Sequence, residues 1–409
     1  MSGKMKRTGL ILLMIILLHS CVDGYQSSAD DQSGQASGLQ DNETTYVDTG
    51  ADCDDDYDAD YEDADEDGVY IPDDTYVVRY DGDRDQLYLD MYQATSLLNE
   101  DVCLIGGSFD RADMYDMPYS GFWIRDYTTR TEYGTDDAAG ESLTYTFYHF
   151  TYDDGLTCTT LAEQRDAIDA AADEIIDRIP LNADTWTQIR IVHDELCRLI
   201  TFDKEFTQPH RYDAYGALVN HIAVCNGYTC AFNHIMSRLG MDTHRVYSKT
   251  HAWNSTGVPS TQEYIDITWD DTDTYDEYGR EYVNYAYLFL TYDEMESVNE
   301  HQDISGEPYA YMDDPAVYNY HMHEGYYIYD YTWDDLVDKM RRQYESGTNM
   351  LTVRFASRDD YEKVKQWDDS GRTELGDLLR ELNYNGNGIY TWYKDEVNTL
   401  SIGLYPPPQ

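Results

Sequence analysis

The order of hydrophobic patterns in the middle of the chain constrains its fold more than any other feature. Apolar residues at helical spacing fill two stretches, one opening at the capping-box sequence Thr160-Leu-Ala-Glu163 and one near Thr185. A third helical stretch begins at or just before Cys225, and Gly240 is a natural end for it. Strand-like pieces follow at Thr243–Ser248, His251–Asn254 and Tyr264–Trp269. This succession predicts an α+β core.

Three residue types suited to nucleophilic catalysis occupy informative places in that core. Cys225 opens the third helix, where the helix dipole favours a thiolate. His251 opens a strand, and a histidine beside a thiolate completes an ion pair and can protonate a leaving amine. Asp266 alternates with Ile265 and Ile267, and an inward-facing carboxylate needs a partner because a buried unpaired charge is costly. Such a carboxylate fixes the orientation of the histidine.

Each of these residues also has an ordinary structural explanation when it is taken alone. A lone cysteine on an apolar helix is usually a packing residue, and we interpret the mid-helix Cys230 in that way. Most of the 11 histidines are expected at the surface. The apolar stripes of the first two helices are interpreted as core rather than cofactor contacts. Only the combination of cysteine, histidine and aspartate points to catalysis.

Three motifs resemble those of bacterial transglutaminase-like proteins. The segment from Ala214 to Tyr228 resembles the nucleophile segment of that family. His251-Ala-Trp-Asn254 resembles its HAWN strand, and the segment from Tyr264 to Asp271 resembles its VDVTWDD strand. The resemblance covers about residues 187–301, and more loosely 110–345. Three motifs in the right order are more specific than any one of them.

The resemblance implies a papain-like core in which the cysteine helix packs on an antiparallel sheet that carries the histidine and the aspartate. It implies that Cys225 is the nucleophile, His251 the base and Asp266 the orienting acid, and it implies no cofactor. Asn226 stands where a glutamate often follows the cysteine, which puts the substrate preference in doubt. The backbone N–H of Cys225 is one oxyanion donor by geometry, and Tyr215 is a candidate for the second.

These residues predict an extracellular cysteine-dependent enzyme that cleaves amide bonds through a thioester at Cys225. Its expected substrate is a protein or peptide, such as a cell-envelope peptide. Water as the acceptor gives peptidase or amidase activity, whereas an amine gives protein-glutamine acyl transfer. Hydrolysis is favoured, because water is abundant outside the cell and nothing suggests a dedicated amine site.

A non-catalytic surface module is the competing interpretation. The chain has 41 tyrosines, clustered in Tyr309–Tyr331, and aromatic surfaces bind peptides or glycans well. Ordinary strand content in a tyrosine-rich protein is the favoured explanation of these tyrosines. The complete triad favours the enzyme, because a pure binding module has no need to retain it.

The first twenty residues have the layout of an export signal, with a positive start and a short apolar stretch from Leu10 to Leu18. The following Leu18-His19-Ser20-Cys21 resembles a bacterial lipoprotein processing site, which makes Cys21 the candidate lipidation site. We therefore expect an exported protein, anchored by its N-terminal lipid to the outer face of the cell membrane. The alternative is a secreted protein cut near Ser20.

An acidic stretch without lysine or arginine runs from residue 22 to about residue 75 and predicts a disordered linker. Within it, Asp63, Asp65, Asp67 and Asp74 have the spacing of a calcium loop. Asp74 is shorter than the usual glutamate and no flanking helix is evident. The solvated linker is therefore favoured, and no metal is predicted.

The overall charge excludes one class of partner. With 80 acidic and 28 basic side chains the net charge is -52, and such a surface repels nucleic acid and anionic lipid. Export permits disulfides among the seven cysteines, although their pairing cannot be read from the sequence.

The sequence predicts five successive regions. A β-rich portion with a strand around residues 142–152 precedes the core, and an α+β domain follows it, with a helix over Trp333–Glu345 and a hairpin over Ile389–Leu404. The predicted regions are the signal (1–21), the linker (22–75), the β-rich portion (76–157), the catalytic core (158–305) and the C-terminal domain (306–409).

Overall fold

The computed structural model describes residues 69–136, 141–257, 263–306, 319–367, 373–386 and 388–405. The predicted signal, the lipidation site Cys21 and the calcium-loop candidates Asp63, Asp65 and Asp67 lie outside these residues. Asp74 lies in an exposed turn. The described residues from Asp74 onward belong to one compact unit. Within the described ranges, no helix has the length and apolar character needed to cross a membrane.

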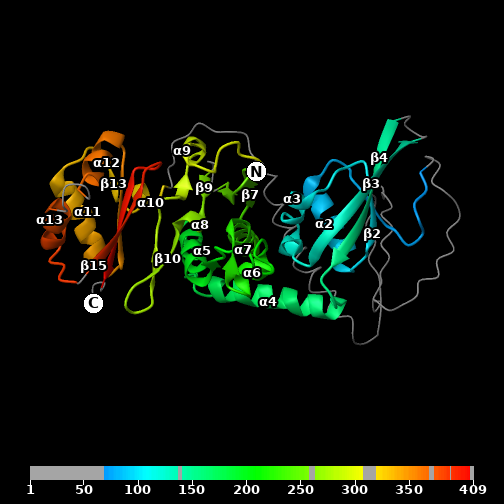
Figure 1. The fold of residues 1–409 in the computed structure, drawn as a ribbon, viewed down its shortest axis with the longest axis horizontal. Coiled ribbons are helices and arrows are strands. Elements are labelled where there is room, and N and C mark those ends of the chain that lie inside the picture. Colours follow the sequence, from blue (N-terminus) through cyan, green and yellow to red (C-terminus); the bar gives the residue numbers. More distant parts are fainter. Residues whose placement is uncertain are drawn as a thin grey trace, which may run out of the picture. The chain divides into compact units, whose positions relative to one another are not determined.

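The predicted β-rich portion contains a four-stranded sheet in the order β1-β2-β4-β3 (Figure 1). β1 runs parallel to β2, and the other neighbours are antiparallel. Its elements are β1 (Tyr76–Arg79), α2 (Arg84–Ser96), β2 (Asp101–Ile105), α3 (Arg111–Met114), the 3-10 helix η1 (Pro118–Gly121), β3 (Ile124–Asp136) and β4 (Glu141–Tyr152). The aromatic alternation that predicted a strand belongs to β4, where Tyr148 and Phe150 are buried.

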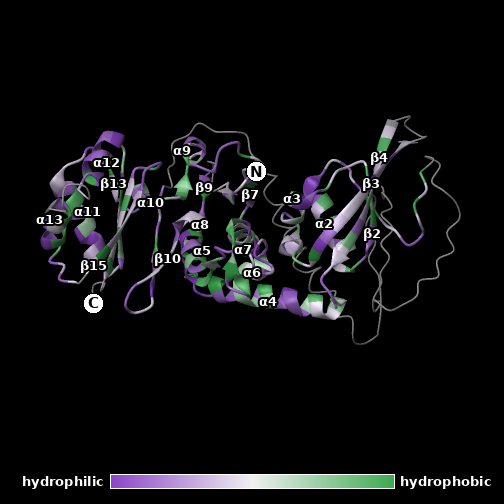
Figure 2. Ribbon diagram, viewed as in Figure 1, coloured by the Kyte–Doolittle hydropathy of each residue, from purple (hydrophilic) through white to green (hydrophobic). Residues whose placement is uncertain are grey.

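The two predicted amphipathic helices are α4 (Cys158–Ile176) and α5 (Thr185–Leu199). Figure 2 shows alternating hydrophobic and hydrophilic bands along α4. The expected start of this helix at Thr160 is wrong. Thr157 is the N-cap, and its hydroxyl accepts the N–H of Thr160 while the Thr160 hydroxyl accepts the N–H of Thr157. The capping box therefore lies one turn earlier than the Thr160–Glu163 spacing suggested.

The predicted catalytic core holds a second sheet, in the order β12-β9-β8-β7 with antiparallel neighbours throughout. Helix α7 (Cys225–Arg238) packs on β7 and β8, as the predicted α+β class with a cysteine helix on an antiparallel sheet requires. This confirms the fold class. The elements of this part are β5 (Thr201–Phe202), α6 (Ala214–Leu218), β6 (Ile222–Ala223), β7 (Thr243–Tyr247), β8 (Ala252–Thr256), β9 (Glu263–Ile265) and β12 (Leu288–Leu290).

The strand expected from Tyr264 to Trp269 is shorter than predicted. β9 ends at Ile265, and Asp266 is the N-cap of the short helix α8 (Ile267–Asp270). The Asp266 carboxylate accepts the N–H of Trp269, and this local bond turns the chain out of the strand. A hairpin and a further helix follow: β10 (Asp271–Tyr275), β11 (Glu281–Val283) and α9 (Tyr292–Ser297).

The C-terminal sheet has the order β13-β14-β16-β15. The predicted helix is α11, with the expected bounds Trp333–Glu345. Before β16, Val397 packs in the same buried cluster as Val246 and Trp253 of the catalytic sheet. The remaining elements are α10 (Tyr320–His323), β13 (Tyr327–Ile328), β14 (Met350–Phe355), α12 (Arg358–Lys365), α13 (Thr373–Glu381), β15 (Gly388–Lys394) and β16 (Thr399–Tyr405).

Each four-stranded sheet lies within one predicted region, while the region boundaries themselves stay a prediction. Much of the tyrosine cluster at Tyr309–Tyr331 lies outside the described residues. Cys158, at the start of α4, is disulfide-bonded. Among the described residues, Cys197, Cys225 and Cys230 are free cysteines.

Candidate active site

Cys225 is the first residue of α7, and no side chain caps this end of the helix. The first N–H groups of a helix have no acceptor within it, so the end of the helix favours an anion. Cys225 is half-buried, whereas Cys197 and Cys230 are buried. The Cys225 thiol therefore lies, partly accessible, at the positive end of a helix.

The chain segment before α6 contacts the first turn of α7 closely and forms hydrogen bonds with it. A Cβ on Gly227 would lie 2.7 Å from the carbonyl oxygen of Arg211, so only glycine permits this close approach. The Val224 N–H donates to the same carbonyl at 2.9 Å. The buried Asn226 donates its amide to the Tyr212 carbonyl. Asn226, the departure from the family pattern, thus helps to hold the nucleophile segment in place.

His251 directly precedes β8 and Asp266 directly follows β9, and their side chains meet. Nε2 of His251 lies 2.6 Å from Oδ2 of Asp266. Both side chains are buried, and Asp266 is wholly inaccessible. Ser248 fixes the backbone at His251, because its hydroxyl accepts the His251 N–H and its own N–H donates to the His251 carbonyl.

The electrostatics of the pair follow from this burial. Burial lowers the pKa of His251, but attraction and hydrogen bonding to Asp266, with a side-chain hydrogen bond to Cys225, outweigh it and raise the pKa to about 10. Burial raises the pKa of Asp266, yet His251 and His301 hold it well below its usual range. At neutral pH the pair is an imidazolium and a carboxylate. Since Asp266 occupies Nε2, Nδ1 is the nitrogen that remains for Cys225.

A further histidine that the sequence did not suggest completes the site. Nε2 of His301 lies 2.7 Å from the same Oδ2 of Asp266, and His301 is fully buried. The rings of Trp253 and Trp269 lie 4.5 and 4.9 Å from its ring. His301 belongs to no motif. The only available signal was general, since a buried aspartate usually accepts more than one hydrogen bond.

The structure also places two further residues that the sequence analysis singled out, Tyr215 and Cys230. Tyr215 lies in α6, with its ring stacked on Phe122 at 5.2 Å and edge-on to His210 at 5.1 Å. Among the described contacts, none joins the Tyr215 hydroxyl to Cys225, so its oxyanion role stays a prediction. Cys230 is buried, and burial raises its pKa, which suits the packing role inferred for it.

Within the part of the chain that the structure describes, two groups of side chains are close enough to hold a metal ion. In the first, ligand atoms of His251, Asp266 and His301 lie within 4.8 Å of one another. Both histidines direct Nε2 at one carboxylate oxygen at hydrogen-bond distance. Each contact therefore needs a proton on the histidine nitrogen, where a metal would need a lone pair. The arrangement is that of a hydrogen-bonded triad.

The second group is Asp271, Asp273 and Glu281, an oxygen donor set of the kind that hard cations prefer. Burial and the neighbouring Asp271 raise the pKa of Glu281 to about 10, so Glu281 keeps its proton at neutral pH. Lys204 pairs with Asp273 at 3.0 Å. The retained proton and this lysine balance much of the charge of the group.

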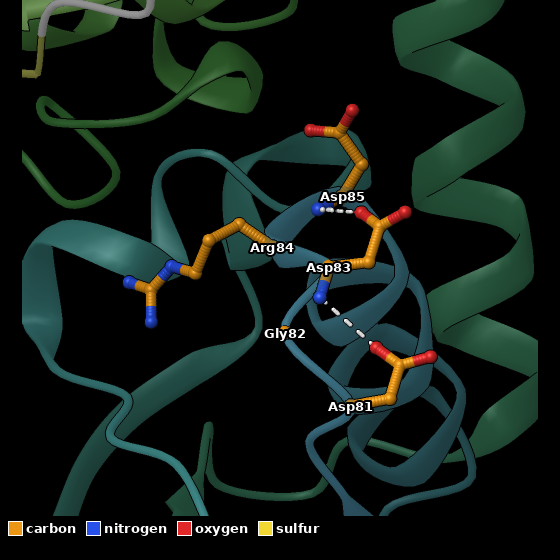
Figure 3. A pocket seen from close by; sticks show the side chains of 5 residues that line it. All are labelled: Asp81, Gly82, Asp83, Arg84 and Asp85. Carbon is orange, nitrogen blue, oxygen red and sulfur yellow. Dashed lines mark hydrogen bonds between the residues drawn. The ribbon is translucent and has the colours of Figure 1, made fainter.

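A surface concavity of about 460 Å³ lies at the start of α2 (Figure 3). It is lined by Asp81, Gly82, Asp83, Arg84 and Asp85. The carboxylate of Asp83 caps the helix and accepts the Asp85 N–H, so the helix end is already satisfied. No member of the triad lines this concavity.

Comparisons with known proteins assign no function to this chain, so the geometry of the site is the main evidence for its function. No family model matches the sequence, and no curated protein matches it. Solved structures with some likeness include a TGase (11% identity, TM-score 0.25, covering 50% of this chain and 62% of that one). Menin, whose structure shows its binding site for the Mixed Lineage Leukemia protein, has 17% identity and a TM-score of 0.23, covering 54% of this chain and 51% of menin.

A protein from Cytophaga hutchinsonii, provisionally named a cysteine protease, has 10% identity and a TM-score of 0.21 over 36% of this chain and 65% of that one. The chain spans less than two thirds of the length of each of these three proteins. All three TM-scores are below 0.5, so none of these likenesses assigns an activity to the chain.

Proposed function

We propose that this protein is a cysteine-dependent enzyme that cleaves amide bonds in proteins or peptides through a thioester at Cys225. One observation carries the proposal: the imidazole of His251 is held between Asp266, at 2.6 Å, and the thiol at the start of α7. Nucleophile, acid–base group and orienting carboxylate thus stand in the order that the chemistry needs.

Acylation begins from the thiolate and imidazolium pair. The Cys225 sulfur attacks the carbonyl carbon of the amide, and the electron pair of the C=O bond moves to oxygen. The uncapped N–H groups at the start of α7 stabilise this oxyanion. When the C–N bond breaks, Nδ1 of His251 gives its proton to the leaving amine, and a thioester remains on Cys225.

In deacylation, His251 acts as a base instead of an acid. His251, now neutral, takes a proton from the acceptor while the acceptor oxygen or nitrogen attacks the thioester carbon. The C–S bond breaks, and the thiolate and imidazolium pair is restored. Water as the acceptor yields a carboxylic acid, and we take hydrolysis as the main reaction. A primary amine would yield a new amide, which is the transferase outcome.

We also propose that the enzyme works outside the cell, held at the membrane by lipid on Cys21. The sequence Leu18-His19-Ser20-Cys21 supports this proposal. Mass spectrometry of the N-terminal peptide from the native host should show lipid on Cys21 at the new N-terminus. An unmodified start at Val22 or Asp23 would overturn it, and release into the medium would favour secretion.

The direct test is covalent trapping. The full-length protein is incubated with a mixture of peptides, quenched in acid and measured intact by mass spectrometry. An acyl adduct that maps to Cys225, together with release of an amine, is expected for the native protein. Hydroxylamine should remove the adduct, because it cleaves thioesters.

The matched controls are Cys225→Ala and Cys230→Ala. The first should give no adduct, and the second should behave like the native protein, because Cys230 lies in the interior of the same helix. Addition of a fluorescent amine separates the two acceptors: amine incorporation identifies transfer, and its absence with continued cleavage identifies hydrolysis. Peptide binding without any adduct would favour the surface-module interpretation.

A further inference from the structure

His301 makes a pair of contacts that place an unusual demand on its protonation. Its Nε2 lies 2.7 Å from Oδ2 of Asp266, the oxygen that also takes Nε2 of His251 at 2.6 Å. Its Nδ1 lies 2.9 Å from the carbonyl oxygen of Asn299. Each ring nitrogen of His301 therefore faces an oxygen, one from a carbonyl and one from an ionised carboxylate. Neither oxygen has a hydrogen to donate.

A neutral imidazole has one N–H and one lone-pair nitrogen, so it can satisfy only one of these two oxygens. The doubly protonated ring donates to both. The surroundings also suit a cation, since the rings of Trp253 and Trp269 lie 4.5 and 4.9 Å from His301. Aromatic rings at such distances stabilise positive charge. Geometry alone therefore favours the imidazolium form.

The charges around His301 determine what this form does. Asp266 is its counter-ion, and the ring of His251 lies 4.8 Å away. Lys394 of β15 donates to the Trp269 carbonyl, and its ammonium lies 5.9 Å from the centre of the Trp269 ring. The acidic residues next to His301 in the chain are exposed: Glu300 and Asp303.

We propose that His301 is a positioning residue that stays an imidazolium, fixes the Asp266 carboxylate and weakens its hold on the proton of His251. This inference rests on the proposed function of the triad. A lone aspartate that binds the histidine proton too strongly would hinder its transfer to a leaving amine, because a general acid works best near the operating pH. Sharing one carboxylate oxygen between two imidazoliums divides that attraction.

The sign of the effect is fixed by electrostatics. Removal of a positive charge strengthens proton binding at every nearby group. His301→Gln keeps an amide donor for Asp266 but removes the charge. We therefore expect the titration of His251 to move to higher pH by about one unit, a tenfold change in proton affinity. The acid limb of Cys225 alkylation should move in the same direction by a smaller amount, because Asp266 and His251 lie between Cys225 and His301.

The experiment combines nitrogen NMR of ¹⁵N-histidine-labelled protein, titrated up to about pH 12 so that the native and the shifted His251 titrations are both covered, with iodoacetamide alkylation between pH 4 and pH 10. Ring nitrogen shifts distinguish an imidazolium from either neutral tautomer, and His301→Gln assigns the signal. In the native protein His301 should be an imidazolium at pH 7. A neutral His301 ring, or a His251 titration that is unchanged in His301→Gln, would overturn the proposal.

Two further variants make the result specific. His301→Leu removes both donor and charge, so a merely structural role predicts that it loses stability while His301→Gln behaves like the native protein. His193→Gln alters another buried histidine and should leave the alkylation profile unchanged. If His301→Gln does not fold, the NMR state of native His301 still decides the question. A native Cys225 no faster than a model thiol would refute the proposed function alone, since the ring state of His301 is measured independently.

Discussion

Two buried histidine–carboxylate clusters lie at the two ends of α8, and the contrast between them shows what makes one a candidate active site. Asp266 caps the start of α8 and binds His251 and His301. Asp270 is its last residue and lies 3.3 Å from Nε2 of His193. We call these groups the Asp266 cluster and the Asp270 cluster.

Each cluster also has a cysteine close by. Cys197 lies in the interior of α5, fully buried, with its thiol 3.8 Å from the Ile267 carbonyl oxygen. Burial raises the pKa of Cys197 well above its ordinary value, so this thiol stays protonated. Cys225 is half-buried and begins a helix. The same three residue types therefore give a candidate active site at one end of α8 and a packed core at the other.

The two clusters contain the same residue types, so composition does not distinguish them. They differ in the solvent access of the cysteine and in its position along its helix. In the Asp270 cluster, the carboxylate also accepts the N–H groups of Ala286 and Tyr287, which ties it to the backbone before β12. His193 lies between Asp194, at 3.1 Å, and Asp270. The bonds of Asp270 join α8 to α5 and to the chain before β12, and His193 and Asp270 are both fully buried.

The largest expected effect concerns the two cysteines. Cys225→Ala should lower turnover by at least about a thousandfold, because the nucleophile is lost. Cys197→Ala should retain native turnover. Turnover of a peptide found by the trapping experiment, and mapping of iodoacetamide-labelled peptides, check both. If Cys197 were labelled as fast as Cys225 in the folded protein, the expected difference in reactivity between the two cysteines would be wrong.

The next effect compares the two histidines at the same thiol. His251→Ala should slow alkylation of Cys225 at pH 7 by about a hundredfold, since the thiolate loses its cationic partner. His193→Ala should leave that rate nearly unchanged. Stopped alkylation time courses on folded samples measure both rates. Equal slowing in the two variants would mean that the clusters act as one electrostatic unit.

Stability should show the opposite ranking. His193→Ala removes one charged partner from each of two buried carboxylates, Asp194 and Asp270, and should lower the free energy of unfolding by about 3 kcal/mol. His251→Ala should cost less, because Asp266 keeps the bond from His301. Urea unfolding at pH 7 measures the two changes. A larger loss for His251→Ala would indicate that the Asp266 cluster is the main structural one.

The smallest expected effect is the pH dependence of stability. Hydrogen bonds to Asp194 and Asp270 outweigh burial and raise the pKa of His193 to about 9, and the pKa of His251 is about 10. A raised histidine pKa gives stability that is complete below the unfolded value of about 6.5 and is lost as the pH rises through the folded value.

The free energy of unfolding should therefore fall between pH 7 and pH 10. Glu281, whose pKa is raised to about 10, acts in the same direction. The contribution of His193 to this fall is the difference in the free energy of unfolding between the native protein and His193→Gln. Urea unfolding at steps of half a pH unit measures it. An identical slope from pH 7 to pH 9 in both proteins would show that His193 does not titrate there.

Local sequence signals predicted much of the secondary structure. The bounds of α11 follow from its strongly amphipathic pattern, and the start of α7 at Cys225 follows from the change of periodicity there. The errors in the bounds of elements arise where alternative local hydrogen bonds compete. Thr157 rather than Thr160 caps α4, and Asp266 ends β9 by capping α8. Such competitions are decided by a single side-chain bond, which periodicity does not record.

The sequence by itself determined that a cysteine helix precedes strands with a histidine and an aspartate, because helical and strand periodicities are local properties. Only the tertiary structure decided which histidines reach which carboxylates. His301 follows Asp266 by 35 positions and meets it through the packing after α9. His193 and Cys197 have the same chemistry as the predicted triad, yet their burial removes them from reaction. Burial and long-range hydrogen bonds depend on how elements pack, and that information is spread over the whole chain.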